Sequence, residues 1–303
     1  MGGPAPEAPD PEAPDPKAPI PEASDAKAPT PEASDAKAPI PGARVPDAPV
    51  LEAPVLEARG LVREFRGFRA VDGVDLGIGK GSVHALVGPN GAGKTTLFNL
   101  LTGFLKPTAG SVLLEGRREL AGRSPEAITR LGVARSFQIT SLFAELTPLR
   151  HLELALASGT GLGWRFWRSD RTLNRFAGRA GELLDEVGLG GHGDVPAGSL
   201  SYGSKRALEL ALALALDPGV LLLDEPTAGM GVEDVERTIE LIRRIRAGRT
   251  VVLVEHNMSV VASLADRVTV LQHGRVLAEG PYAEIRHDPR VITAYLGDSH
   301  AAR

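Results

Sequence analysis

One glycine-rich segment has the residue types and spacing needed to bind phosphate. It follows an apolar run at residues 83–87 and precedes helical spacing at 95–101. Glycines let backbone amides turn toward phosphate oxygens, and a helix N-terminus favours anions. In such a motif the lysine reaches the β- and γ-phosphates and the next hydroxyl ligates Mg²⁺. We therefore predict a nucleotide-binding P-loop, with Lys94 on phosphate and Thr95 on Mg²⁺, formed by Gly88, Pro89, Asn90, Gly91, Ala92, Gly93, Lys94, Thr95 and Thr96.

Two adjacent carboxylates, Asp224 and Glu225, follow a second apolar run at residues 220–223. Ligands of parallel α/β sheets gather at the carboxyl ends of the strands, so this pair is expected beside the phosphates. Asp224 would hold Mg²⁺, directly or through water, and Glu225 would polarise the attacking water as a general base. Neighbouring strand residues point in opposite directions, which suits two different roles. The alternative is a pair of surface charges in a strand-to-loop turn.

A third apolar run, at residues 250–254, ends at Glu255 and His256. A histidine in this place could hold the γ-phosphate and position the water, although a lone histidine at a strand end is usually a hydrogen-bonded polar residue. Its position one strand–helix–strand unit after Glu225 favours the catalytic interpretation. The histidines without such a context are interpreted as structural: His84, His151, His192, His273, His287 and His300.

These motifs require a sheet that brings several strand ends together. Short apolar runs bounded by glycine or charged residues predict strands, and apolar residues at helical spacing predict helices. The predicted strands are 83–87, 111–114, 220–223 and 250–254, and the predicted helices are 95–101 and 233–245. Their alternation predicts an α/β fold with a mostly parallel sheet and helices on both faces. Residues from about 140 to 200 predict a helical insertion.

Composition excludes several classes of site. The chain has 303 residues and no cysteine, which excludes a disulfide framework and a thiolate metal site. The formal net charge of −4 does not indicate a basic face for nucleic acid, so no nucleic-acid partner is expected. The most apolar helix-like run, 207–216, contains Glu209 and is far shorter than the roughly 20 residues of a membrane span. No secretory signal is recognisable. A membrane role would therefore need another subunit.

The first part of the chain has a different composition. The sequence PEASDAKAP occurs at 21–29 and again at 31–39. Frequent proline removes backbone donors and fixes φ, and few large apolar residues are present to offset the entropy of ordering. Residues 1–54 are therefore predicted to form a disordered, polyproline-like tail, either dispensable or serving as a tether.

The order of the motifs resembles that of the ABC ATPase family. The P-loop is followed by Gln138, by LSYGS at 200–204, by LDEPT at 223–227 and by His256. This series separates the chain from other P-loop classes, and the Asn-Lys-x-Asp motif of small GTPases is absent from the sequence. The resemblance implies ATP as the bound nucleotide and ATP hydrolysis as the activity.

The same resemblance implies a domain organisation. It runs from about Leu56 to Gly297 and implies a P-loop NTPase core with an antiparallel β subdomain. The implied ATPase domain is 55–297, with a helical subdomain at about 139–205 and a C-terminal tail at 298–303.

The resemblance also assigns roles to residues outside the P-loop. Phe65 is similar to the aromatic that stacks on adenine, with Phe68 as a nearby alternative, and either could belong to the core. Gln138 is similar to the glutamine that meets Mg²⁺ and the attacking water. Ser201 and Gly203 would face the γ-phosphate bound by a second subunit, so two chains would enclose two ATP molecules.

Two features depart from the family pattern. In the LSYGS segment Tyr202 stands where glycine is usual, and Ser204 stands where glutamine is usual. The segment 228–231 lacks the aspartate that couples the two sites in many members, so no coupling carboxylate is assigned.

Four stretches look like the ATP-binding subunits of branched-chain amino acid importers: 96–104, 135–138, 201–203 and 291–297. This branch implies transmembrane permease subunits, a second ATPase subunit that is identical or different, an indirect solute-binding protein and a place on the cytoplasmic face of the membrane. Aromatic and arginine residues at 161–168 would contact the permease or lipid headgroups, or anchor the helices internally. Alternatives are a non-transport ABC ATPase acting on nucleic acid or the ribosome, an export or lipid motor, and a regulatory module without turnover.

Overall fold

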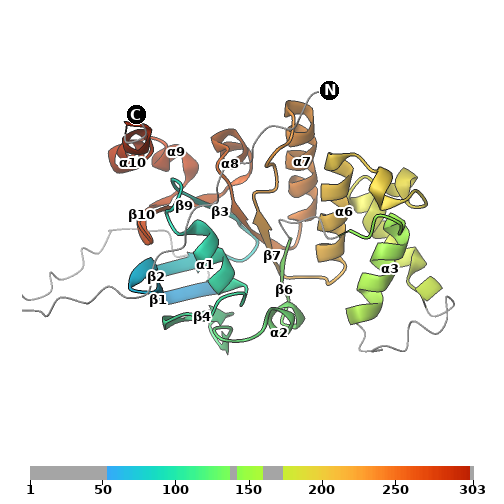
Figure 1. The fold of residues 1–303 in the computed structure, drawn as a ribbon, viewed down its shortest axis with the longest axis horizontal. Coiled ribbons are helices and arrows are strands. Elements are labelled where there is room, and N and C mark those ends of the chain that lie inside the picture. The colour runs from blue at the N-terminus through green and yellow to red at the C-terminus, as the bar shows by residue number, and fades with distance from the viewer. Residues whose placement is uncertain (1–52, 137–141, 160–172, 301–303) are drawn as a thin grey trace, which may run out of the picture. The chain divides into compact units, whose positions relative to one another are not determined.

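A six-stranded sheet forms the centre of the fold (Figure 1). The computed structural model describes residues 53–136, 142–159 and 173–300. The strand order is β10-β9-β3-β8-β7-β6, and every neighbouring pair is parallel except β9 and β10. The bounds are β3 Val83–Val87, β6 Val133–Arg135, β7 Val220–Asp224, β8 Thr250–Val254, β9 Arg267–Gln272 and β10 Arg275–Gly280. The predicted mostly parallel sheet is confirmed.

The central strands are apolar at nearly every position because both faces of the sheet are covered, and their polar residues are His84, Asp224 and Thr250. All residues of β3, β7 and β8 are buried. Successive side chains alternate between two cores: Leu221 and Leu223 belong to one, and Val220 and Leu222 belong to the other. The acidic residues at the end of β7 are therefore positioned by a strand that is fixed from both sides.

An antiparallel sheet and helix α1 (Lys94–Leu101) cover one face. The sheet has the order β2-β1-β4-β5, and all its paired strands are antiparallel. Its strands are β1 Leu56–Phe65, β2 Phe68–Ile78, β4 Ala109–Leu114 and β5 Arg118–Glu119, and helix α2 (Pro125–Arg130) follows. Leu56 and Leu61 of β1 pack in the same core as Phe98 of α1 and Val252 of β8. This face, predicted to carry helices, thus carries α1 together with the antiparallel sheet implied by the family resemblance.

Helices cover the other face. Val260 and Val261 of α8 pack in the same core as Ile242 of α7 and Leu253 of β8. The bounds are α7 Val232–Ile245, α8 Met258–Leu264, α9 Tyr282–Ile285 and α10 Pro289–His300. Helix α7 begins with Glu233 and Asp234 and ends with Arg243 and Arg244, charges that complement the helix dipole.

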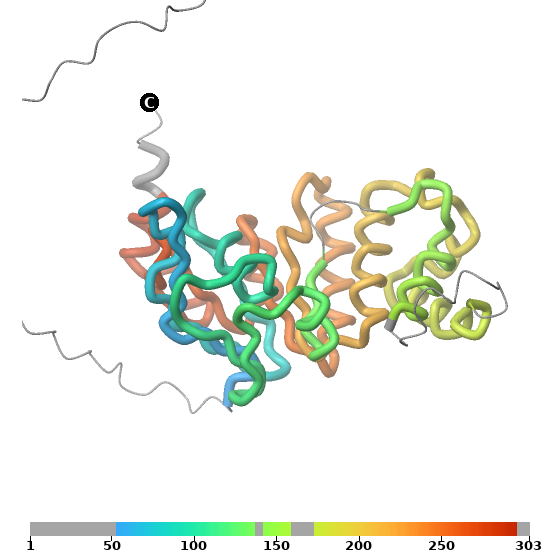
Figure 2. Tube along the Cα trace, turned by 60° about the horizontal axis from the view of Figure 1, so that its bottom comes forward, coloured from blue at the N-terminus to red at the C-terminus, as the bar shows by residue number. Residues whose placement is uncertain are grey.

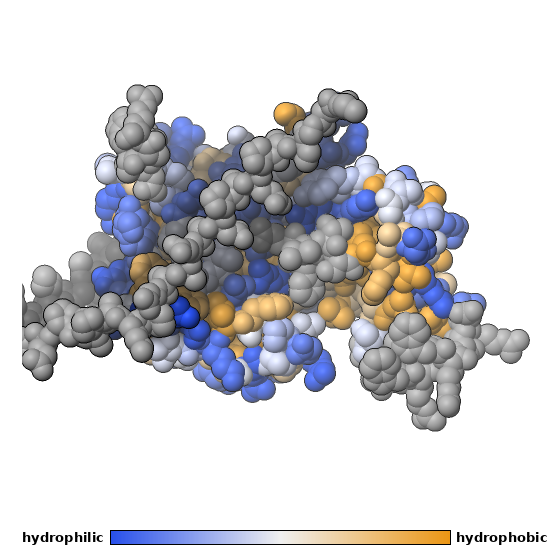
Figure 3. Space-filling view, in the orientation of Figure 1, coloured by the Kyte–Doolittle hydropathy of each residue, from blue (hydrophilic) through white to orange (hydrophobic). Residues whose placement is uncertain are grey.

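The stretch between β6 and β7 is built of helices where the structure describes it. It contains α3 Pro148–Gly159, α5 Ala177–Glu186, α6 Tyr202–Leu214 and the short 3₁₀ turns η2 Gly190–His192 and η3 Ala197–Ser199. Figure 2 shows this stretch, green to yellow, beside the sheet that carries β3 and β7. Apolar side chains gather on its surface around α3 (Figure 3). Phe143, whose amide donates a hydrogen bond to His151 of α3, is 66% exposed.

Among the described residues, no helix is both long enough and apolar enough to cross a membrane. Two predicted features, the proline-rich repeats at 21–39 and the aromatic and arginine segment at 161–168, lie outside the described residues.

Candidate active site

The side chain of Lys94, the first residue of α1, turns back over the loop that precedes it. Its Nζ donates hydrogen bonds to the backbone carbonyls of Gly88 (2.6 Å) and Pro89 (2.9 Å). Burial lowers the pKa of Lys94, and the nearby carboxylate of Glu225 opposes that shift. A phosphate oxygen would give this half-buried ammonium group a charged acceptor in place of neutral carbonyls.

The loop backbone requires glycine at both ends. Gly88 and Gly93 have φ of 149° and 100°. A Cβ at Gly88 would lie 2.2 Å from the carbonyl oxygen of Leu271, and one at Gly93 would lie 2.4 Å from that of Ala70. The loop is therefore pressed against the ends of β9 and β2. Of the other residues predicted for the loop, Asn90, Gly91 and Thr95 are exposed. Thr96 is half-buried and Ala92 is buried.

Asp224 is the last residue of β7 and is only 3% exposed. Its carboxylate and the Thr95 hydroxyl are the hard oxygen donors that suit Mg²⁺. Within the described ranges, no group of three or more His, Cys, Asp or Glu side chains could hold a metal ion. The protein thus offers few ligands for a metal ion. This suits Mg²⁺, which usually takes its remaining ligands from substrate phosphates and water.

Arg135, the last residue of β6, contacts the Asp224 carboxylate. Its Nη2 donates to Oδ2 of Asp224 at 2.5 Å, and its Nη1 donates to Oδ1 of Asn99 at 2.5 Å. Spacing along the sequence does not predict this interaction, because Arg135 and Asp224 lie 89 residues apart.

Glu225 lies just beyond β7 in a left-handed backbone conformation, with φ of 45°. The expectation that Asp224 and Glu225 alternate as strand neighbours is therefore wrong, because the chain already turns at Glu225. A bulky residue in this region stores strain that the surrounding structure must hold, and such residues cluster at functional sites. The Glu225 amide donates to the carbonyl of Val254 at 3.0 Å, which fixes the turn to the neighbouring strand.

Glu225 and His256 approach one another at the ends of neighbouring strands. The Nδ1 atom of His256 lies 3.9 Å from Oε1 of Glu225, and the side chains are 64% and 31% exposed. This separation is too long for a direct hydrogen bond. Both groups are accessible, so the geometry is compatible with the predicted roles of base and water-positioning residue.

Glu255, the residue before His256, is fully buried at 0% exposure. One carboxylate oxygen accepts from the amide (3.1 Å) and hydroxyl (2.6 Å) of Thr227. The other accepts from the amides of His256 (3.1 Å) and Asn257 (3.3 Å). Glu255 thus fixes the turn after Glu225 and the segment carrying His256. Sequence analysis missed this role, although an acidic residue directly after an apolar strand was a usable signal.

Ser201 caps helix α6. Its side chain accepts a hydrogen bond from the Ser204 amide at 3.2 Å, and the two hydroxyl oxygens lie 3.0 Å apart. A Cβ at Gly203 would come within 3.2 Å of the Asp234 carboxylate, so α7 packs closely there. Figures 1 and 2 both show α6 well separated from α1, on the far side of β7. The predicted phosphate contacts of Ser201 and Gly203 therefore start from a helix on the other side of β7 from the P-loop helix.

The two candidate adenine-binding aromatics lie at the β1–β2 turn. Phe65 is 39% exposed and Phe68 is 66% exposed. The guanidinium of Arg63 lies 4.5 Å from the centre of the Phe65 ring, so a cation covers part of that ring. Neither side chain belongs to the core. Gln138, predicted to contact Mg²⁺ and water, lies outside the described residues.

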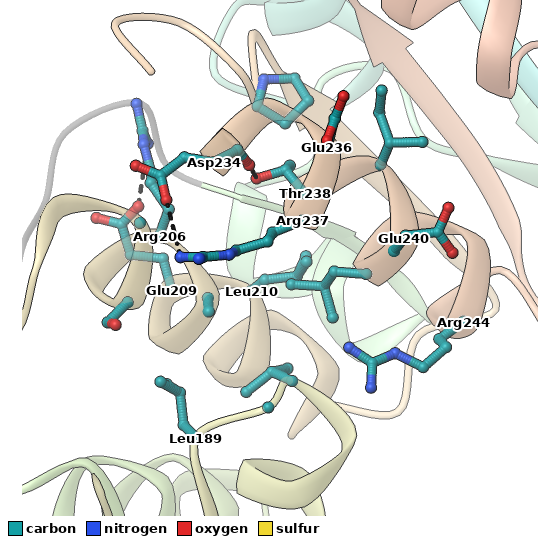
Figure 4. Close-up of a pocket in the computed structure, with 18 of the residues that line it drawn as sticks. Leu189, Arg206, Glu209, Leu210, Asp234, Glu236, Arg237, Thr238, Glu240 and Arg244 are labelled. Carbon is teal, nitrogen blue, oxygen red and sulfur yellow. Dashed lines mark hydrogen bonds and ion pairs between the residues drawn. The ribbon is translucent and has the colours of Figure 1, made fainter. Parts of the chain in front are cut away.

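A cleft of about 1100 Å³ lies between α6 and α7 (Figure 4), and its lining includes Asp224, Ser201 and Gly203 of the candidate site. Three of its arginines pair with carboxylates: the guanidinium of Arg206 lies 3.0 Å from Glu209, that of Arg237 3.6 Å from Asp234 and that of Arg243 2.5 Å from Glu240. These matched charges offer no surplus positive potential for phosphates. The P-loop therefore remains the candidate nucleotide site.

Known families and proteins match most of the chain. The ABC transporter family matches residues 71–228, and the branched-chain amino acid ATP-binding cassette transporter family matches residues 275–301. The chain is 40% identical over 255 residues to the high-affinity branched-chain amino acid transport ATP-binding protein BraF of Pseudomonas aeruginosa, covering 81% of this chain and 98% of BraF.

Solved structures agree with the sequence matches. The ADP conformation of MJ1267, an ATP-binding cassette of an ABC transporter, superposes with a TM-score of 0.72 at 29% identity, covering 80% of this chain and 98% of MJ1267. The dimeric structure of MJ0796, a bacterial ABC transporter cassette, superposes with a TM-score of 0.64 at 25% identity, covering 75% of this chain and 98% of MJ0796.

Proposed function

Because the chain belongs to the ABC transporter family of ATP-binding proteins and is an ATPase, we propose that it drives a separate membrane permease from the cytoplasmic face of the membrane. The proposed cargo is branched-chain amino acids or related polar solutes, taken up with the help of a solute-binding protein. The name of BraF and the match at residues 275–301 support this cargo. The apolar surface around α3 (Figure 3) supports the helical stretch as the permease contact.

The proposed chemistry uses the residues around the P-loop. The loop amides and Lys94 bind the phosphates of ATP, and Thr95, Asp224 and Gln138 are the residues that would hold Mg²⁺. The ion, when bound, neutralises the charge that develops on the phosphates. Glu225 accepts a proton from the attacking water, and His256 orients that water beside the γ-phosphate.

Two copies, or one copy and a similar subunit, complete the site. Ser201 and Gly203 at the start of α6 contact the γ-phosphate bound by the other subunit. One observation carries this proposal: α6 is separated from α1 of its own chain (Figures 1 and 2). The dimeric structure of the similar cassette MJ0796 supports the same arrangement.

The transport proposal is tested by uptake of labelled leucine in cells whose own copy of the protein carries Glu225→Gln. Leucine uptake is expected to fall at least tenfold, while uptake of an unrelated sugar stays normal. Glu182→Gln on α5 is the matched control, because that side chain is 68% exposed. Normal leucine uptake in the Glu225→Gln cells would contradict the proposed cargo.

A further inference from the structure

The Arg135 guanidinium is held in one place by three elements. Its side chain is 12% exposed. The guanidinium joins β6 to Asp224 at the end of β7 and to Asn99 of the helix that follows the P-loop, each at 2.5 Å. It also lies 5.1 Å from the Phe98 ring centre and 5.3 Å from that of Phe104. These contacts fix the cation directly against the proposed metal carboxylate.

When no metal is bound, the ion pair with Arg135 neutralises the buried negative charge of Asp224. A carboxylate as buried as Asp224 is costly unless a positive partner lies close to it. Arg135 supplies that partner within the protein. Once a divalent cation binds beside Asp224, the carboxylate faces two positive partners, and these repel one another at short range in a site of low dielectric.

We propose that Arg135 is a positioning residue of the metal site, which holds Asp224 in place without metal and weakens its binding of Mg²⁺. Metal then binds well only when the phosphates of ATP add negative charge. The link to Asn99 extends this effect to α1, so that the P-loop helix and the metal carboxylate share one anchor. The inference rests on the proposed role of Asp224 in the ATPase site.

The test compares thermal unfolding of the wild type with that of Arg135→Met during titration with MgCl₂ in the absence of nucleotide. Without metal, the variant is expected to melt several degrees lower, because Asp224 is left buried without a partner. Mg²⁺ alone is then expected to raise its melting temperature, with a midpoint about three- to tenfold below that of the wild type. A merely structural role for Arg135 would lower the melting temperature without moving the midpoint.

Two further variants keep the test decisive. Arg135→Met/Asp224→Asn lacks both charges, so it should recover part of the lost melting temperature and show no response to Mg²⁺. If Arg135→Met does not fold, recovery of folding in this double variant tests the first half of the inference, that Arg135 offsets the buried charge of Asp224. Arg135→Lys keeps the cation and should retain the wild-type midpoint. An unchanged midpoint in Arg135→Met, or a double variant less stable than the single one, would overturn the inference.

Binding of fluorescent ATP with Mg²⁺ to the wild type distinguishes a failure of the proposed ATPase function from a failure of the proposed role of Arg135. Failure of the wild type to bind would overturn the proposed function itself. Normal ATP binding together with an unchanged Mg²⁺ midpoint in Arg135→Met would overturn only the role of Arg135.

Discussion

The hydroxyl of Tyr202 donates a hydrogen bond to the backbone carbonyl of Ala228 at 3.1 Å. Tyr202 is the first residue of α6, and Ala228 belongs to the turn whose amide returns to the carbonyl of Glu225 at 3.1 Å. The N-terminus of α6, which we propose completes the site of a second subunit, is thus hydrogen-bonded to the turn after Glu225, the proposed base of the same chain. Tyrosine at this place, which departs from the usual glycine, supplies a contact that glycine cannot make.

Tyr202→Phe should lower ATP turnover several-fold with little change in stability. The variant loses one partly exposed hydrogen bond, worth about 1 kcal/mol or less, yet it disconnects α6 from the turn that carries Glu225. Turnover at saturating ATP and urea unfolding measure the two effects. Tyr282→Phe in α9 is the matched control, and equal turnover in both variants would contradict a role for this bond.

Glu255→Gln should destabilise the fold by about 2–3 kcal/mol and abolish turnover. An amide keeps only one oxygen for four hydrogen-bond donors and points its own donors at the rest, which leaves buried groups unpaired. Urea unfolding and ATPase assays measure both effects. The control is Glu240→Gln, whose side chain is 66% exposed. A loss below about 0.5 kcal/mol would rule out the organising role of Glu255.

Gly88→Ala should prevent ATP binding, whereas Gly91→Ala should reduce it far less. Both glycines have positive φ, but a Cβ at Gly88 meets the carbonyl of Leu271 at 2.2 Å and one at Gly91 meets nothing within 4 Å. Alanine at Gly88 therefore adds a clash to a backbone conformation that only glycine adopts readily, whereas alanine at Gly91 adds only the smaller strain of a left-handed residue. Fluorescent ATP binding provides the measurement, and similar affinities in the two variants would argue against the close packing of the loop.

Acid should destabilise the protein partly through His84. Burial lowers the pKa of His84 from 6.5 to about 4. Its Nε2 lies 2.7 Å from the Thr269 hydroxyl, which itself donates to Glu279, so Nε2 carries the hydrogen. Nδ1 is buried without a partner among the described residues, and protonation there would leave a donor unpaired.

The sign of the effect follows from proton binding. Between pH 6.5 and 4 the unfolded chain binds a proton that folded His84 does not, so stability falls as the pH falls through this window. The loss attributable to His84 at pH 5 is about 2 kcal/mol. Urea unfolding at pH 7.5 and 5 should show a smaller acid loss for His84→Gln than for the wild type. Equal losses would contradict this assignment.

The sequence predicted the elements whose pattern is local. Runs in which nearly every residue is apolar predicted β3, β7 and β8, because these strands are buried on both faces, and the glycine spacing predicted the P-loop. The antiparallel strands β1 and β2 came only from the family resemblance, because their half-buried positions alternate irregularly around bulges.

The interactions that organise the site depend on contacts between distant residues. In the sequence, Arg135 is an ordinary charged residue, and its contact with Asp224 exists only because β6 pairs with β7. Glu255 is likewise a charge at a strand end, and its bonds to Thr227 exist only in the folded structure. Tertiary packing decides whether a carboxylate is buried and which group pairs with it. The spacing of residues along the sequence carries no information about that packing.

The central claim, that two subunits complete each ATPase site, is tested most directly by the dependence of ATP turnover on protein concentration. We expect turnover to rise more than in proportion to concentration, and the Glu225→Gln variant to be inactive across the same range. Turnover strictly proportional to concentration down to the lowest measurable level, or turnover unaffected by Glu225→Gln, would contradict the account.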